Sequence, residues 1–410
     1  MLGNSQHISV VIGLAAVFGA GCVNSIVPAL ERPWVRHVID NAPRGADGVR
    51  LADANGDGLP DIVTPWEESG RVRAYLNPGS TRSTRPWPAV TVGEVGSPED
   101  AVFWDVDGDG AIDVVTATEG DVETVWLHWA PPDPSRYLDS HAWMTQPIPA
   151  TVHAREWMFC MPMDVDSRHG IDLVLGAKGP DAQIGWLESP VDPRDLAAWR
   201  WHSLYDAGWI MSLAIADMDG DGDSDIVASD RKGDTRGCLW LENPGVTQVR
   251  TAPWPVHHIS TNGRNYMFLA LADLDQDAML DVVAATSTRE LLFHRRQSSD
   301  GTAWESFPIR LPDCVGTGKA VAVADMDEDG RLDIVVTCEN AQDGRLGVVW
   351  LSYRTQVTAS IWDVHDISGP EGVKYDLVRV LDLDGDIDLD VLTCEERTNL
   401  GVIWYENPIH

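Results

Sequence analysis

Short apolar runs alternate with turn-forming residues along almost the whole of residues 34–410. Each run is roughly four to seven residues long and is rich in Val, Ile, Leu and Trp, which favour strands. Gly, Asn, Asp and Pro separate the runs, and none of them extends into the longer 3.6-residue pattern of an amphipathic helix. The pattern therefore predicts an all-β fold.

The apolar runs belong to a unit that occurs seven times, at spacings of 52 to 59 residues. In each unit a first run leads into an Asp-rich loop and a second run, and most units continue with a Trp-Leu-Glu-Asn-Pro type run and a Trp-x-x-His-x-Ile type run. The Asp-rich loops begin at Asp53, Asp105, Asp164, Asp217, Asp273, Asp325 and Asp382. Repeats of this length with four short strands each are typical of propeller blades, so we predict a seven-bladed β-propeller with four-stranded blades.

The two ends of the repeated region complement each other. Residues 34–40 form a fourth-strand phrase with no blade before it, whereas the last unit ends with its third run, residues 402–405. We therefore predict that the N-terminal strand completes the last blade and closes the ring, which removes an exposed sheet edge. The propeller domain would span residues 34–410.

A separate apolar stretch precedes the propeller. Residues 8–20 have the length of a signal-peptide core and are too short to cross a bilayer comfortably as a helix. The Gly-Ala-Gly-Cys sequence that ends at Cys22 resembles a bacterial lipobox, although the segment before the core has no Lys or Arg. We expect a signal peptide with a lipobox at residues 1–22, lipidation of Cys22, and a tether at residues 23–33. The alternatives are plain cleavage or an uncleaved anchor, so the protein would be exported as a cell-envelope lipoprotein or secreted.

The chain is strongly acidic, with 64 Asp and Glu against 30 Lys and Arg and a formal net charge of −34. Such a surface repels phosphate groups and anionic lipid headgroups, so we expect no nucleic-acid partner and membrane attachment only through a lipid anchor. A hydrophobic content of 44% separates the chain from acidic disordered proteins. We expect a folded monomer whose natural partners include cations.

The repeated Asp-x-Asp-x-Asp-Gly-x-x-Asp loops, with the Trp-Tyr-Glu-Asn-Pro and Trp-x-x-His-x-Ile phrases, resemble those of FG-GAP/VCBS-type repeat proteins. The resemblance covers residues 34–410 and implies a propeller like that of the integrin α subunit. In that family the loop joins the first and second strands of a blade and holds Ca²⁺. The family includes adhesion modules, fungal lectins and the propellers of some polysaccharide lyases and sugar dehydratases, so it implies no single activity.

The loops have the donors that a hard cation needs. Ca²⁺ takes about six to eight oxygen ligands, and Asp at loop positions 1, 3, 5 and 9 can supply several of them from one tight turn. The third loop has Arg168 at position 5 and the fifth has Ala278 in place of Gly, so we expect five to seven structural Ca²⁺ ions. The alternative is that these runs are only turns, which Asp and Gly favour on their own. The predicted metal ligands are Asp53, Asn55, Asp57 and Asp61; Asp105, Asp107, Asp109 and Asp113; Asp164, Asp166 and Asp172; Asp217, Asp219, Asp221 and Asp225; Asp273, Asp275, Asp277 and Asp281; Asp325, Asp327, Asp329 and Asp333; and Asp382, Asp384, Asp386 and Asp390.

The face opposite these loops collects charged and aromatic residues from the starts of the first strands and the ends of the second strands. Aromatic rings stack on sugar rings and charged groups bind hydroxyls, so this mixture suits a carbohydrate, although it would also suit a solvated rim. The candidate ligand-binding residues are Trp66, Glu67, Glu99, Asp100, Arg155, Glu156, Trp157, Trp209, Arg231, Lys232, Tyr266, Lys319, Lys374, Tyr375, Asp376, Glu395, Glu396 and Arg397.

Three functions fit these observations. We favour a non-enzymatic protein that binds a polysaccharide, a glycan or a surface protein through this face. A lyase or dehydratase acting on sugars is the second, with its site at the mouth of the central channel and Lys319, Lys374, Tyr375 or the carboxylates as acid and base. The third is a scaffold for protein adhesion. The His residues of the Trp-x-x-His-x-Ile runs recur from blade to blade, so we expect them to be structural: His37, His202, His257 and His365.

Overall fold

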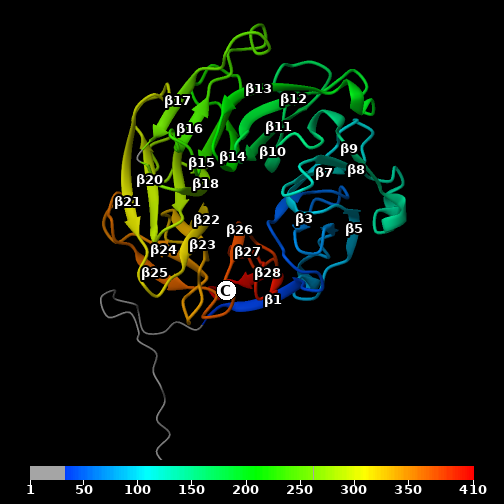
Figure 1. The fold of residues 1–410 in the computed structure, drawn as a ribbon. Helices are drawn as coiled ribbons and strands as arrows, with labels where there is room; N and C mark the ends of the chain where they lie inside the picture. The colour runs from blue at the N-terminus through cyan, green and yellow to red at the C-terminus, as the bar shows by residue number, and fades with distance from the viewer. Residues whose placement is uncertain (1–32, 262) are drawn as a thin grey trace, which may run out of the picture.

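The computed structural model describes residues 33–261 and 263–410. In this part of the chain, 28 strands form seven four-stranded antiparallel sheets, which follow one another around a ring (Figure 1). The predicted seven-bladed β-propeller is therefore confirmed. The predicted signal peptide, Cys22 and nearly all of the tether lie outside the described residues. No helix of the described part has the length and the apolar character that crossing a bilayer requires.

The blades follow the order of the chain, and each begins with its innermost strand. The first four are β2 (Arg50–Ala52), β3 (Asp61–Trp66), β4 (Arg71–Tyr75) and β5 (Ala89–Glu94); β6 (Pro98–Trp104), β7 (Asp113–Thr118), β8 (Val125–Trp129) and β9 (Met144–Pro147); β10 (Glu156–Met163), β11 (Asp172–Lys178), β12 (Gln183–Glu188) and β13 (Arg200–Asp206); and β14 (Ile210–Ala216), β15 (Asp225–Asp230), β16 (Gly237–Leu241) and β17 (Val256–Ser260). The last three are β18 (Tyr266–Ala272), β19 (Asp281–Thr286), β20 (Glu290–Arg296) and β21 (Trp304–Arg310); β22 (Thr317–Ala324), β23 (Asp333–Glu339), β24 (Val348–Ser352) and β25 (Asp363–Asp366); and β26 (Tyr375–Leu381), β27 (Asp390–Glu395), β28 (Gly401–Glu406) and β1 (Val35–Asp40).

Helical structure in the described residues is confined to single 3₁₀ turns within the loops. These turns are η1 (Ser80–Arg82), η2 (Pro134–Arg136), η3 (Ser140–Ala142), η4 (Pro149–Thr151) and η5 (Leu196–Ala198). Asp133 and Asp139 cap η2 and η3 by accepting hydrogen bonds from backbone N–H groups. The loops therefore add local turns without adding another layer to the blades.

The N-terminal strand closes the ring as predicted. Strand β1 pairs antiparallel with β28, and His37 lies opposite Trp404 in that pairing (Figure 1). The last blade therefore takes three strands from the C-terminal end of the chain and one from its beginning. This pairing satisfies the backbone groups of an edge that would otherwise be open.

The second strands of the blades lie deepest in the fold. All six residues of β7 are buried, as are all six of β15, because neighbouring blades cover both faces of each sheet. These strands read as continuous runs of Val, Ile, Ala and Thr instead of alternating apolar and polar residues. Large side chains fill the space between blades, with Trp186, Trp240 and Trp404 among those that are fully enclosed.

The antiparallel topology separates the loops onto two faces. The Asp-rich loops join first to second strands and share one face with the loops that join third to fourth strands. The loops that join second to third strands, and those that lead from one blade to the next, lie on the opposite face. We call the first the Asp-loop face and the second the opposite face.

Candidate functional site

The Asp-rich loops fold around their own carboxylates. In the loop between β14 and β15, the two side-chain oxygens of Asp217 accept hydrogen bonds from the backbone N–H groups of Gly220 and Gly222, at 2.8 and 3.1 Å. Asp219 Oδ1 accepts a further bond from the N–H of Asp221, at 3.1 Å. The first and third positions therefore shape the turn and bring their carboxylates together.

The ninth position of the loop has a second role that the sequence pattern did not indicate. Asp225 is buried, its Oδ2 accepts from Met218 N at 2.7 Å, and its Oδ1 accepts from Asn243 N at 2.8 Å. It thus ties the loop to the end of the third strand. The equivalent residues of five other blades make the same pair of bonds: Asp61, Asp113, Asp172, Asp281 and Asp390.

The loops fit a divalent cation. In at least four of them, one side-chain oxygen from each of positions 1, 3 and 9 lies within 4.8 Å of the other two. Several oxygens of these loops are buried without a hydrogen-bond donor among the described residues, including Asp105 Oδ1, Asp275 Oδ1 and Asp384 Oδ1. Burial of charged oxygens without a partner is costly, and a Ca²⁺ ion would satisfy several of them at once. The four triads are Asp105, Asp107 and Asp113; Asp164, Asp166 and Asp172; Asp217, Asp219 and Asp225; and Asp273, Asp275 and Asp281.

Guanidinium groups reach the position-3 carboxylate in some loops. Arg194, from the neighbouring blade, contacts Asp107, and Arg295 Nε lies 2.6 Å from Asp275 Oδ2. In the third loop, where Arg168 interrupts the carboxylates, Arg250 Nε lies 3.6 Å from Asp166 Oδ2. These arginines offset part of the negative charge that the loops concentrate.

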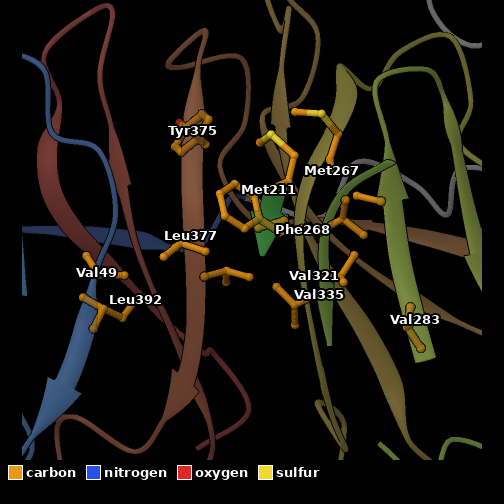
Figure 2. Packing of buried hydrophobic residues seen from close by; sticks show 14 of the residues in the cluster. Val49, Met211, Met267, Phe268, Val283, Val321, Val335, Tyr375, Leu377 and Leu392 are labelled. Atoms are coloured by element: carbon orange, nitrogen blue, oxygen red, sulfur yellow. The ribbon is translucent and has the colours of Figure 1, made fainter. Parts of the chain in front are cut away.

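The axis of the ring is filled with side chains. A cavity of about 20 Å³ remains there, which is room for one water molecule. Figure 2 shows Met211, Met267 and Phe268 close together between the inner strands, with Leu377 on β26. The cavity is lined by Asp47, Glu99, Asp100, Met158, Phe159, Met211, Phe268, Lys319, Asp376 and Leu377. The side chains of the inner strands therefore leave little free space in this part of the axis.

The charged residues around this cavity are paired with one another. Lys319 Nζ lies 3.0 Å from Asp376 Oδ2, Lys374 contacts Glu396, and Lys178 contacts Glu119. Asp100 Oδ2 lies 3.7 Å from Arg50 Nη2. Of the predicted residues, Glu99, Asp100, Lys319 and Asp376 are brought together here.

Two carboxyl groups near the axis hold their protons more tightly than usual. Burial raises the pKa of Glu99 to about 7, against the opposing effect of Lys178. Burial also raises the pKa of Asp47 well above its usual range, and the nearby Asp376 and Glu99 carboxylates add to this effect. Asp376 behaves differently, because Lys319 and a hydrogen bond with Asp47 outweigh its burial and lower its pKa.

A larger cavity lies on the opposite face, between the third and fourth blades. Its volume is about 510 Å³. The lining residues are Glu156, Lys178, Gly179, Gly208, Trp209, Lys232 and Gly233. Three predicted residues, Glu156, Trp209 and Lys232, therefore meet in one hollow. The glycines were missed, because glycine next to a strand end signals a turn and says nothing about a cavity wall.

Trp209 is the central side chain of this cavity. Its ring is half-buried, and three cations lie near it, with Lys232 Nζ at 3.9 Å, Lys178 Nζ at 4.8 Å and Arg231 Cζ at 5.0 Å from the ring centroid. Attraction between such cations and the indole ring stabilises this arrangement. The Trp209 indole N–H is covered and has no acceptor among the described residues.

Asp230 fixes the backbone on both sides of this ring. Its carboxylate accepts hydrogen bonds from Gly208 N and Trp209 N, at 2.9 and 2.8 Å, and from Lys232 N at 3.2 Å. The N–H of Arg231 donates to the carbonyl of Trp209 at 2.8 Å. The position of Trp209 therefore depends on a buried carboxylate at the end of β15.

Five predicted ligand-binding residues are enclosed by the fold, and the structure removes them from the candidate site. Trp66, Trp157, Tyr266, Tyr375 and Glu395 are all fully buried. The indole N–H of Trp66 donates to Tyr75 and that of Trp157 donates to the carbonyl of Thr151. The Tyr266 and Tyr375 hydroxyls donate to Ser260 and to the carbonyl of Glu371, and Glu395 accepts from the backbone N–H groups of the following turn.

Three further predicted residues, Glu67, Arg155 and Arg397, do not line the Trp209 cavity. Glu67 lies beside Asp47 and Glu99, within 4.8 Å between side-chain oxygens. Arg155 donates to the carbonyl of Asp181 and to the side chain of Gln183, so its charge supports a loop. Arg397 is exposed in the turn that follows β27. The third and fourth blades therefore form a ligand-sized cavity on the opposite face.

The fold and its Asp-rich loops define the class of protein as a β-propeller. The FG-GAP-like repeat matches this sequence twice, at residues 53–116 and 273–336. With the seven blades, these matches support an FG-GAP repeat propeller. No curated protein matches the sequence.

Solved structures with a similar fold share little sequence with this chain. One is the crystal structure of BBS1N in complex with ARL6DN soaked with mercury, which has a TM-score of 0.51 and 12% sequence identity. The matched region covers 91% of this chain and 97% of the chain in that structure. The same complex soaked with lead has the same TM-score and identity. There the matched region covers 92% of this chain and 98% of the chain in that structure. At this identity the similarity extends to the fold alone.

Proposed function

We propose that this propeller is a binding protein that takes up a carbohydrate in the cavity beside Trp209. The observation that carries the proposal is this cavity of about 510 Å³, with an aromatic ring among polar groups and glycines. Its volume falls in the range of about 300–1,000 Å³ that is typical of small-molecule sites.

The residues around the cavity suit a sugar. A pyranose ring has an apolar face that packs on an indole ring, and its hydroxyls need donors and acceptors nearby. Trp209 would supply the ring, and Glu156 and Lys178 would supply an acceptor and a donor. Gly208 lets the two walls of the cavity approach each other, because a Cβ there would lie 2.2 Å from the carbonyl oxygen of Lys232.

Catalysis at the axis receives less support. Asp47, Glu99, Lys319 and Asp376 have the mixed charges of an acid–base site, but the cavity that they line has only about 20 Å³. A sugar ring does not fit in the space of one water molecule. The Tyr375 hydroxyl, one of the predicted acids, is already engaged in donating to the carbonyl of Glu371.

The proposal is tested by calorimetric titration of the Ca²⁺-loaded protein with plant, algal and bacterial oligosaccharides. Trp209→Ala should weaken saturable binding at least 10-fold, whereas Trp209→Phe should keep part of it, because the phenyl ring still packs on a sugar. Trp126→Ala, at another half-buried Trp in β8, is the matched control and should bind like wild type. Equal binding by the Trp209→Ala and wild-type proteins would contradict the proposal, and heat that continues after each injection would indicate turnover.

We also propose that the Asp-rich loops hold structural Ca²⁺ ions. The support is the set of converging carboxylates with unpaired buried oxygens. Positions 1, 3, 5 and 9 would be the ligands, and the ions would offset the charge of neighbouring Asp residues and brace the Asp-loop face. The third loop, with Arg168 in place of a carboxylate, offers the fewest oxygens.

A protein ligand is the second candidate. The observation that favours it is the similar fold of BBS1N, whose solved structures are complexes with ARL6DN. A protein ligand predicts that protease treatment of a target cell surface, and not glycosidase treatment, abolishes binding of the purified propeller. The carbohydrate proposal predicts the reverse.

For the N-terminal segment we propose export with lipid attachment at Cys22. The support is the apolar run followed by a lipobox-like sequence. Metabolic labelling with a radioactive fatty acid tests it, since Cys22→Ala should abolish incorporation. Labelling that survives in this variant would contradict lipidation at Cys22.

A further inference from the structure

We infer that the ligand of the Trp209 cavity is an anionic saccharide, whose carboxylate or sulfate group Arg231 and Lys232 bind. This inference rests on the proposed function and narrows the class of its ligand. Three observations support it: Arg231 and Lys232 are charged, the backbone holds their segment beside Trp209, and both side chains lie over the Trp209 ring.

Arg231 and Lys232 are cations that form no ion pair with a carboxylate of the described residues. In the described part of the chain, neither side chain has a carboxylate within 4.0 Å. Both lie over the ring of Trp209, at 5.0 and 3.9 Å from its centroid. The protein has a formal charge of −34, so acidic groups are abundant. These two cations beside the cavity nevertheless form no ion pair with any of them in the described residues. Their charge therefore remains available to an anion from outside.

The acidic groups nearest to the cavity are already engaged. Glu119 contacts Lys178, and Glu156 Oε2 lies 3.6 Å from the same ammonium group. Asp230 is buried and accepts three hydrogen bonds from backbone N–H groups. These contacts engage the three carboxylates, and none of them forms an ion pair with Arg231 or Lys232, so both side chains are free to contact an anionic ligand. Repulsion from acidic groups elsewhere on the molecule is screened within about 8–10 Å at physiological salt.

Hydrogen bonds of the backbone hold the segment that carries the two cations next to the segment that carries the ring. Asp230 joins the Gly208–Trp209 segment to Lys232, and the N–H of Arg231 donates to the carbonyl of Trp209. A side chain at position 208 would put its Cβ 2.2 Å from the carbonyl oxygen of Lys232, so only glycine permits this approach. The segments therefore meet closely and present one aromatic ring with two cations.

These groups define a ligand with two chemical parts. A sugar ring would pack on Trp209, and its anionic substituent would accept charge-assisted hydrogen bonds from the guanidinium and ammonium groups. Lys232 is exposed and lies over the ring, so its flexible side chain can move aside to admit the sugar.

Titration with matched probes tests the inference. The probes are oligogalacturonate, its carboxyl-reduced counterpart and a sulfated galactan oligosaccharide, each added to the Ca²⁺-loaded protein. We expect at least one anionic probe to bind 10-fold or more tightly than the reduced probe, and its affinity to fall as salt rises from 50 to 200 mM. The two anionic probes distinguish carboxylate from sulfate.

Variants separate this inference from the proposed function. Arg231→Gln together with Lys232→Gln should bring the affinity for the anionic probe down to that for the reduced probe, while Arg236→Gln, on the same loop but bonded to backbone carbonyls, should leave it unchanged. Equal binding of anionic and reduced probes that still depends on Trp209 would overturn the anionic ligand and leave the carbohydrate site intact. Absence of binding by every probe would overturn both.

Discussion

The imidazole ring of His257 stacks on the indole ring of Trp240, with 4.1 Å between the ring centroids and 15° between the ring planes. The two residues face each other across β16 and β17, and His257 Nε2 lies 2.7 Å from Glu242 Oε2. The same stack recurs in three other blades, where it joins His37 to Trp404, His202 to Trp186 and His365 to Trp350. Each stack fastens the outermost strand of a blade to the third strand.

Removal of one such stack should lower stability and leave binding unchanged. We expect His257→Ala to reduce the free energy of unfolding by about 1–2 kcal/mol, because the ring contact and the hydrogen bond to Glu242 are both lost. Urea unfolding followed by circular dichroism measures this change. His258→Ala is the matched control, since that neighbouring side chain is exposed, and a loss of the same size in both variants would contradict the structural role of the stack.

Chelation of Ca²⁺ should lower the melting temperature by at least about 10 °C. Each ion present at 100 times its dissociation constant adds about 2.7 kcal/mol, and five to seven sites would multiply this effect. Calorimetry with and without EDTA measures it, and an unchanged melt would count against the metal proposal. At a single loop, Asp217→Asn should reduce the number of bound ions by one, whereas Asp223→Asn, outside the predicted ligand positions, should not.

Asp100 should prove structural, although its position on the opposite face predicted a ligand contact. Its carboxylate accepts a hydrogen bond from Cys160 N at 2.9 Å and lies beside the buried Arg50 guanidinium. Burial, together with the nearby Arg50, already lowers the pKa of Arg379 to about 10, so the region tolerates little more positive charge. Asp100→Ala would leave Arg50 unpaired and should cost about 3–5 kcal/mol of stability in urea unfolding. Simultaneous Arg50→Met should recover much of the loss, and failure to do so would contradict the ion-pair explanation.

The architecture could be predicted from the sequence because the repeat makes it redundant. Seven copies of one loop fix the number of blades, and the unmatched strand phrases at residues 34–40 and 402–405 show where the ring closes. The position-9 Asp of the loop was only partly understood. Its pairing with the end of the third strand, as between Asp225 and Asn243, joins segments 18 residues apart and depends on the folded blade.

The ligand face was predicted less well, and irregular strand pairing explains why. Trp157, Tyr266 and Tyr375 stand at the beginnings of inner strands, where alternation alone leaves either face open to them. Register shifts follow each of these residues, between Trp157 and Phe159 in β10 and at the equivalent places in β18 and β26. A shift of this kind changes which side chains point inward, and the sequence pattern does not reveal it. Trp209 lies just before its strand and not within it, so the register shift that accompanies burial of Trp157, Tyr266 and Tyr375 does not involve it.

Asp230 should act on ligand binding by holding Trp209 in place. Asp230→Asn retains the size of the side chain but loses the charge and one of the two strong acceptors, so we expect it to weaken saccharide binding about 10-fold or more. The protein should still fold, as judged by circular dichroism. Asp234→Asn, an exposed change on the same loop, serves as control and should have wild-type affinity. Wild-type affinity in Asp230→Asn would contradict the positioning role.

Two buried histidines should make the protein less stable in mild acid. Burial lowers the pKa of His128 to about 3, and burial with the nearby Arg264 charge lowers the pKa of His294 to about 3, whereas an unfolded histidine titrates near 6.5. Between these values the unfolded chain binds a proton that the folded protein does not, so stability falls as pH decreases from about 6.5. At pH 4.5 each histidine should cost about 2.7 kcal/mol relative to neutral pH. Urea unfolding across this range measures the slope, which His128→Asn should reduce by about 1.4 kcal/mol per pH unit at the acidic end. Thr145→Val removes a hydrogen-bond partner of His128 but keeps the titrating ring, so it should lower stability without flattening the slope. An unchanged slope in His128→Asn would contradict a contribution of His128 to the acid sensitivity.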